Sequence, residues 1–149
     1  MLERLPPVNA LKLSFYAYPL VNALHILAIG ALVTAVMLMD LRILGGLAAL
    51  PRGAFLGAMR RTIALALTAA VLSGLALFSI RAQEYATNFA FLAKMTLLAA
   101  AGLNLLAFRL VRAPPGDGIP YPPTAKALAV LSMAIWTLVL VAGRFIGFI

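Results

Sequence analysis

Three basic side chains, His25, Lys94 and Arg144, are the best candidates for chemistry, because each lies within or at the end of a strongly apolar run. Imidazole is the commonest protein ligand for metals, and one proximal histidine suffices to hold haem iron. Lysine and arginine side chains bind anionic groups such as carboxylates. The chain has one histidine and no cysteine, which excludes disulfides, thiolate metal sites and iron–sulfur clusters.

The composition indicates a membrane protein. Hydrophobic residues make up 64% of the 149 residues and charged residues 11%, whereas soluble domains have about 45–50% and about 25%. The net charge of +8 comes from basic residues at the ends of apolar runs. This placement is typical of membrane orientation rather than of nucleic-acid binding.

Four apolar segments are long enough to cross a bilayer, which takes about 20 residues. They cover residues 15–39, 62–80, 86–108 and 127–143, approximately. Gly45, Gly46, Pro51 and Gly53 interrupt the chain after the first, a short polar turn at 81–88 follows the second, and a proline-rich loop at 112–124 follows the third. The apolar run after Lys12 is too long for a secretory signal. We therefore expect an all-α fold, a single antiparallel four-helix membrane domain over residues 1–149.

Basic residues set the expected orientation. Seven lie in or beside the first and third loops: Arg42, Arg52, Arg60, Arg61, Arg109, Arg112 and Lys126. Four lie on the opposite side: Arg4, Lys12, Arg81 and Arg144. The positive-inside rule predicts that the two basic loops face the cytoplasm of a bacterial inner membrane and that both termini face the periplasm.

In this orientation the three basic groups gather in the outer half of the bundle. His25 is expected in the outer half of the first span and Lys94 in the outer half of the third, while Arg144 ends the fourth. Asn22 lies one turn from His25 on the same helix face. Ionisable groups at this depth should face the bundle interior or a wet cavity.

Helix faces give two further expectations. The stripes Ala66, Ala70, Gly74 and Gly143, Gly147 have the spacing of close helix contacts in lipid. Trp136 lies mid-span, away from the interfacial belt, and is therefore expected to pack inside. It belongs to a set at intervals of four that we expect to line the same site: Ser132, Trp136, Leu140 and Arg144.

A second polar group is expected on the inner side. Asp40 and Arg42 are two residues apart, so on a helix they point in different directions and do not pair with each other. Candidate partners from other segments are Arg60, Arg61, Arg109 and Lys126, with Asn104 as a hydrogen-bond relay. We interpret these residues as structural ion pairs at the membrane surface.

For His25 several roles stay open. It could ligate haem iron or another metal, hydrogen-bond Asn22 or a neighbouring helix, or handle protons. Lys94 and Arg144 suit haem propionates, but they suit equally a small anion, a lipid headgroup or a quinone oxygen, or they could snorkel to the interface.

The stretches "LHILAIGALVTAVMLMDLRILG", "FAFLAKMTLLAAAGLN" and "SMAIWTLVLVAGRFIGF" resemble a bacterial family of four-helix membrane proteins of unknown function. More distantly, the first-span histidine and third-span lysine resemble CopD-type copper-resistance membrane domains, and the histidine resembles that of HemJ-type haem-binding proteins. These resemblances imply His25 as a haem or metal ligand and Lys94 as its companion. The chain lacks the further histidines and methionine-rich motifs that copper would need, so haem b is favoured over copper, and no cofactor is an alternative.

Three functions are therefore weighed. The first is a haem-associated redox or electron-transfer protein. The second is a non-catalytic subunit or assembly factor of a larger membrane complex, or a homo-oligomer. The third is a small permease or anion-binding or metal-binding protein. No hydrolase or transferase motif is present, which leaves a redox role as the expected enzymatic activity if haem binds.

Overall fold

The computed structural model describes residues 15–80, 82–112, 114, 116 and 118–146. These residues form four long helices, α2 (Ala17–Leu44), α3 (Arg52–Ile80), α5 (Phe89–Leu110) and α6 (Pro123–Phe145), and one short helix, α4 (Ala82–Thr87). All four long helices are long and apolar enough to cross a bilayer. The described residues contain no strand. The expected all-α, four-helix membrane fold is therefore confirmed.

The first two helices extend beyond the predicted spans. α2 continues past Met39 and ends at Gly45, whose φ of 108° is in the left-handed region that favours glycine. α3 begins at Arg52 rather than at residue 62, and Gly53 lies inside the helix. Hydropathy ended the predicted spans where charged residues begin, but arginine is a good helix former and does not end a helix.

The turn between the second and third spans is also partly helical. Residues 82–87 form α4, where the sequence predicted only a polar turn. Asn88 then caps α5, because its side-chain oxygen accepts a hydrogen bond of 3.0 Å from the backbone N–H of Phe91. This cap sets the start of α5 slightly later than the predicted position.

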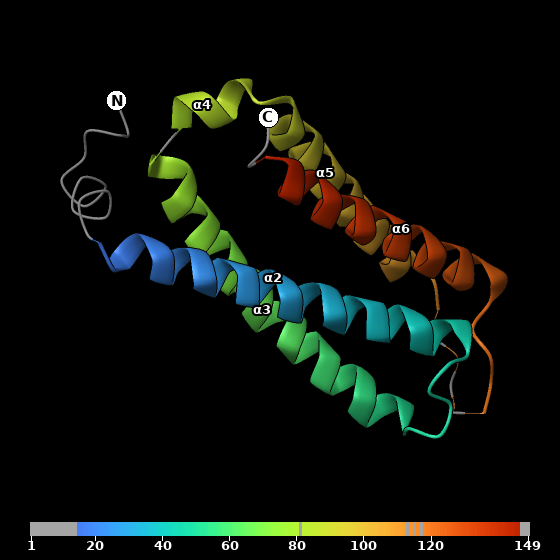
Figure 1. Ribbon diagram of the computed structural model, residues 1–149. Coiled ribbons are helices and arrows are strands. Elements are labelled where there is room, and N and C mark those ends of the chain that lie inside the picture. The colour runs from blue at the N-terminus through green and yellow to red at the C-terminus, as the bar shows by residue number, and fades with distance from the viewer. Residues whose placement is uncertain (1–14, 81, 113, 115, 117, 147–149) are drawn as a thin grey trace.

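The bundle consists of two helical hairpins that meet along one seam (Figure 1). α2 packs mainly against α3, α5 mainly against α6, and the α2–α6 contact joins the two pairs. One end of the bundle, called here the α4 end, holds the start of α2 and of α5 and the finish of α3 and of α6. The opposite end, called the loop end, carries the connections at 45–51 and 111–122.

Small residues and a compact cluster hold the helices together. Ala66 and Ala70 are buried, as expected for a stripe in helix contact. Of the second predicted stripe, Gly147 lies outside the described residues, as do Arg4, Lys12 and Arg81. The core cluster lies at the loop end, and its buried members are Ile43, Ala125 and Ala129, with Leu44, Phe108, Val111 and Tyr121 packed around them.

Arg52 fastens the proline-rich loop to the start of α3. Its Nη2 donates a hydrogen bond of 2.7 Å to the carbonyl of Ile119, and its Nη1 donates one of 3.4 Å to the carbonyl of Pro114. The guanidinium carbon lies 4.8 Å from the ring centroid of Tyr121, a cation–π contact. Charge counting assigned Arg52 only a role in orientation, whereas the structure shows that it also orders the loop.

Candidate functional site

His25 is positioned by a residue that the sequence analysis did not single out. Its ring Nδ1 lies 2.9 Å from the hydroxyl oxygen of Ser73 on α3. Ser73 is buried in the α2–α3 contact and is one of few polar residues in that helix. A serine directly before the glycine of the small-residue stripe in an alanine-rich span was the signal that could have identified it.

The hydrogen bonds around Ser73 define the tautomer of His25. The Ser73 hydroxyl lies 2.6 Å from the carbonyl oxygen of Ala69, one turn earlier in α3, so its single hydrogen is directed there. With the hydroxyl hydrogen assigned to Ala69, Ser73 accepts from His25 and Nδ1 carries the imidazole hydrogen; this tautomer is an assignment from hydrogen-bond geometry. In neutral imidazole the other nitrogen, Nε2, then presents a lone pair.

Glycine lets the imidazole lie directly against α3. A Cβ at Gly74 would stand 3.0 Å from Cε1 of His25 and 3.6 Å from its Nδ1. Gly74 was predicted only as part of a helix-contact stripe, and the structure shows that the stripe ends beneath the candidate ligand. Any larger residue there would displace the ring.

Lys94 approaches the same region from the other hairpin. It packs against α6, where a Cβ at Gly143 would lie 3.6 Å from the Lys94 Nζ. Its ammonium is close enough to His25 for the two groups to interact electrostatically. In the described part of the chain, no hydrogen bond or ion pair engages Nζ. A histidine from α2 and an unpaired lysine from α5 thus face each other across the seam between the hairpins.

The other residues predicted for this site differ in placement. Asn22 and Trp136 are half-buried, and neither side chain forms a hydrogen bond within the described residues. The face of α6 that was expected to line the site is not buried along its whole length, because Leu140 and Arg144 are exposed. Steps of four residues drift by about 40° each on a helix of 3.6 residues per turn, so such a stripe leaves the interface. The buried face of α6 is instead Ala125, Ala129, Ser132, Ile135 and Val139.

An aromatic cluster closes the α4 end. Tyr85 of α4 stacks with Phe78 at 6.2 Å and with Phe91 at 5.8 Å, and the Phe78 and Phe91 centroids lie 5.4 Å apart. Phe78 is one turn beyond Gly74 on the same face of α3. The three rings therefore join α3, α4 and α5 next to the His25 region, a contact that only the tertiary structure brings together.

The inner polar group is not assembled from ion pairs. Asp40 is buried and hydrogen-bonded to Ser132 of α6, and within the described chain it contacts no arginine or lysine as an ion pair. Nη2 of Arg42 donates to the carbonyl of Leu50 at 3.2 Å. Asn104 donates from Nδ2 to the carbonyl of Leu128 at 3.2 Å. Three of the remaining candidates are exposed, which keeps them away from a buried carboxylate: Arg60, Arg61 and Arg109.

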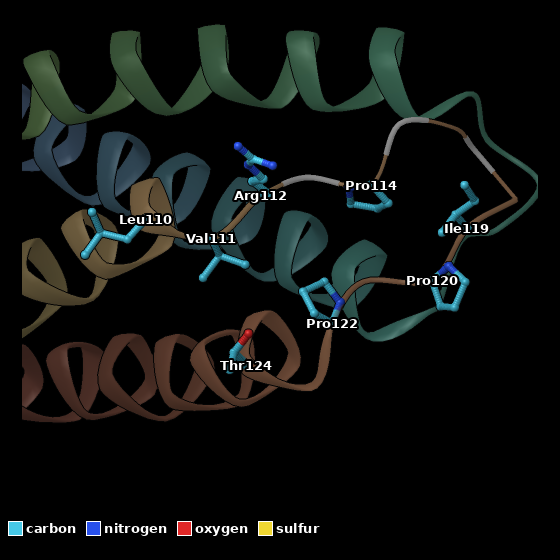
Figure 2. A pocket seen from close by; sticks show the side chains of 8 residues that line it. All are labelled: Leu110, Val111, Arg112, Pro114, Ile119, Pro120, Pro122 and Thr124. Carbon is cyan, nitrogen blue, oxygen red and sulfur yellow. The ribbon is translucent and has the colours of Figure 1, made fainter.

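A surface pocket of about 750 Å³ lies away from the His25 region, at the loop end (Figure 2). It is open and is formed by the proline-rich loop and the adjoining helix ends: Leu110, Val111, Arg112, Pro114, Ile119, Pro120, Pro122 and Thr124. None of these side chains is a histidine or a carboxylate. Across the described residues, no group of three or more histidine and acidic side chains could hold a metal ion.

The fold and these contacts define an integral membrane protein built as a four-helix bundle. The chain belongs to the family of unknown function DUF6644, whose model matches residues 14–149. No curated protein and no solved structure matches it. The predicted membership of an uncharacterised family is therefore confirmed, and the likeness to CopD-type and HemJ-type proteins stays a prediction.

Proposed function

We propose that this protein binds one haem b in the membrane, with Nε2 of His25 as the axial ligand, and serves in electron transfer. The observation that carries the proposal is the hydrogen bond of 2.9 Å between Nδ1 and Ser73, because it leaves the lone pair on Nε2. Histidines that ligate metals nearly always donate their other ring N–H to a protein acceptor, which fixes the ring and its tautomer. Ser73 supplies that acceptor here.

The charge of the site favours haem over a bare metal ion. A divalent cation beside Lys94, with a single imidazole and no carboxylate partner, would be repelled and poorly coordinated. Haem needs one protein ligand and carries two anionic propionates, which an unpaired ammonium can hold. Arg144 directly follows Gly143, against which Lys94 packs, and we assign it to the second propionate.

Bound haem would supply one-electron chemistry, and the residues of this chain would set its conditions. His25 would ligate the iron, and Ser73 would keep the imidazole ring oriented. Lys94 balances the propionate charge within the apolar bundle. The stacked rings of Phe78, Tyr85 and Phe91 would cover part of the site at the α4 end.

The positive-inside rule supports a location in a bacterial inner membrane with the α4 end on the periplasmic side. Single cysteines introduced at Gln83 and at Ile119 test this orientation in intact cells. A membrane-impermeant thiol reagent should label position 83 and leave position 119 unlabelled until the cells are opened. The reverse pattern would overturn the assignment of sides without affecting the fold.

Absorption spectroscopy of the detergent-purified protein tests haem binding. The wild-type protein, expressed with haem supply or titrated with haemin, should show a Soret band at one haem per chain. His25→Ala should abolish it, and added imidazole should restore part of it by replacing the missing ring. If the wild-type protein takes up no haem, the proposal fails. A colourless protein that copurifies with a larger complex would instead support the role of a non-catalytic subunit.

A matched serine pair separates ligand positioning from general stability. Ser73→Ala removes the acceptor of His25, whereas Ser79→Ala in the same helix removes only a hydrogen bond of 2.7 Å to its own backbone at Ala76. Ser73→Ala should weaken haem affinity about 10–100-fold and shift the reduction potential. Ser79→Ala should change neither. Equal effects of the two variants would remove Ser73 from the site.

Anion binding without haem is the second candidate, and the unpaired Nζ of Lys94 favours it. An ammonium inside a bundle that lacks a carboxylate partner attracts a small anion or an anionic headgroup. Lys94→Met should abolish an anion-dependent rise in the unfolding temperature of the colourless protein. Lys126→Met, at the loop end, serves as the control for charge alone. Retention of the effect in Lys94→Met would exclude this candidate.

A further inference from the structure

Two buried oxygen atoms in the loop half of the bundle lack any hydrogen-bond partner among the described residues. They are Oδ2 of Asp40 and Oδ1 of Asn104, whose residues are 4% and 7% exposed. Both atoms are acceptors, and leaving a buried acceptor unsatisfied is costly, more so when it carries charge. Each such atom favours a positively charged or proton-donating group beside it.

α6 brings these two residues to one place. Asp40 reaches it from α2 and accepts from Ser132. Asn104 reaches it from α5 and donates 3.2 Å to the carbonyl of Leu128, one turn before Ser132. Residues four apart are neighbours on a helix surface, so both side chains end at the same turn. The orientation of the amide is fixed, because only its nitrogen can pair with a carbonyl, and Oδ1 is therefore the free atom.

The cationic side chains nearby form no ion pair with Asp40 in the described chain, although Nε of the buried Arg42 also has no hydrogen-bond partner there. On α2, Nη2 of Arg42 is bound to the Leu50 carbonyl, and on α3 Arg52 contacts the proline-rich loop. The other basic residues in the loop half of α3, α5 and α6 form no ion pair with Asp40 in the described chain: Arg60, Arg61, Arg109 and Lys126. Within the described residues the Asp40 carboxyl group therefore forms no ion pair, and its Oδ2 has no hydrogen-bond partner.

We propose that Asp40, Asn104 and Ser132 form a buried site for a monovalent cation, either a proton carried by Asp40 or a sodium ion. Hard cations take carboxylate, amide and hydroxyl oxygens as ligands, which is the donor set present here. A proton on Oδ2 would make Asp40 a donor and the Asn104 oxygen its natural acceptor. The site lies in the opposite half of the bundle from His25 and does not depend on haem.

Infrared difference spectroscopy tests the proton. The chain has only four acidic residues, so a protonated carboxyl band can be assigned by substitution. At neutral pH the wild-type protein should show this band with a deuterium shift. Asp40→Asn should lose it, and the control Glu84→Gln, in α4, should keep it.

Thermal unfolding at constant ionic strength tests sodium. If Na⁺ occupies the site, replacing N-methylglucamine by Na⁺ should raise the unfolding temperature of the wild-type protein, whereas K⁺ should do so less. Asn104→Ala should abolish the difference. The proposal is overturned if the wild-type protein shows neither the carboxyl band nor a sodium-dependent shift, since a water molecule would then satisfy both oxygens. Both measurements use the wild-type chain, so they decide the question even if a variant fails to fold.

Discussion

Substitution of Gly74 by alanine tests the packing that holds His25. The new Cβ would lie 3.0 Å from Cε1 of the imidazole, so the ring must move by a few tenths of an ångström. The ring is fixed on its other side by Ser73 at 2.9 Å, so this movement weakens a hydrogen bond worth about 0.5–1.5 kcal/mol. Replacing a mid-helix glycine by alanine otherwise stabilises by about 0.5–1 kcal/mol. The two effects should nearly cancel in the free energy of unfolding.

Gly57 provides the matched control because it lies in the same helix and a Cβ added to it would have nothing within 4 Å. Gly57→Ala should therefore show the full gain in stability, with a free energy of unfolding about 1 kcal/mol above that of Gly74→Ala. Gly143→Ala should resemble Gly57→Ala, because its Cβ would make only an ordinary contact of 3.6 Å with Lys94. The measurement is reversible unfolding of the detergent-solubilised protein.

Nitrogen NMR of the single histidine supplies the second readout. The wild-type spectrum should show the hydrogen on Nδ1, and Gly74→Ala should mix the two tautomers, whereas Gly57→Ala should leave the spectrum unchanged. If Gly74→Ala gains as much stability as Gly57→Ala and preserves the tautomer, the ring does not pack on α3 as described. The assignment of Nε2 as the free nitrogen would then lose its support.

Three further substitutions test the framework by changes in the free energy of unfolding. Arg52→Lys should destabilise the protein by about 2–4 kcal/mol, because lysine cannot reproduce the two hydrogen bonds to carbonyls and the ring contact. The control Arg60→Lys, at an exposed position, should change the free energy of unfolding by no more than about 0.5 kcal/mol. Similar values for the two variants would contradict the role of Arg52. Asn88→Ala should cost about 1 kcal/mol through loss of the α5 cap and Asn88→Asp much less, and equal losses would argue against a side-chain cap. Gly45→Ala should cost about 1–2 kcal/mol because of its positive φ, and a neutral result would show that α2 ends differently.

The predicted site stays a prediction, and individual residues show how far the sequence could describe its surroundings. His25 and Lys94 were singled out because ionisable groups in apolar spans stand out by composition alone. Ser73 was missed because its role depends on which face of α3 meets α2. Asp40 was expected to form an ion pair with arginine, because opposite charges attract. The helix packing instead makes Ser132 its partner, and Arg42 is directed to a loop carbonyl.

The sequence by itself indicated a lipid environment, the number of spans and their antiparallel order. The reason is that the hydropathy of a segment of about 20 residues is a local property and is enough to indicate a membrane-spanning helix. It also established that the chain has one histidine and no cysteine, which excludes thiolate metal sites. The tertiary structure alone decided which helices touch, with α2 between α3 and α6. The helix packing sets which nitrogen of His25 is free and which oxygens near Asp40 lack hydrogen-bond partners. Hydrogen bonds between helices depend on the rotation and register of each helix, and a hydrophobic pattern does not define these.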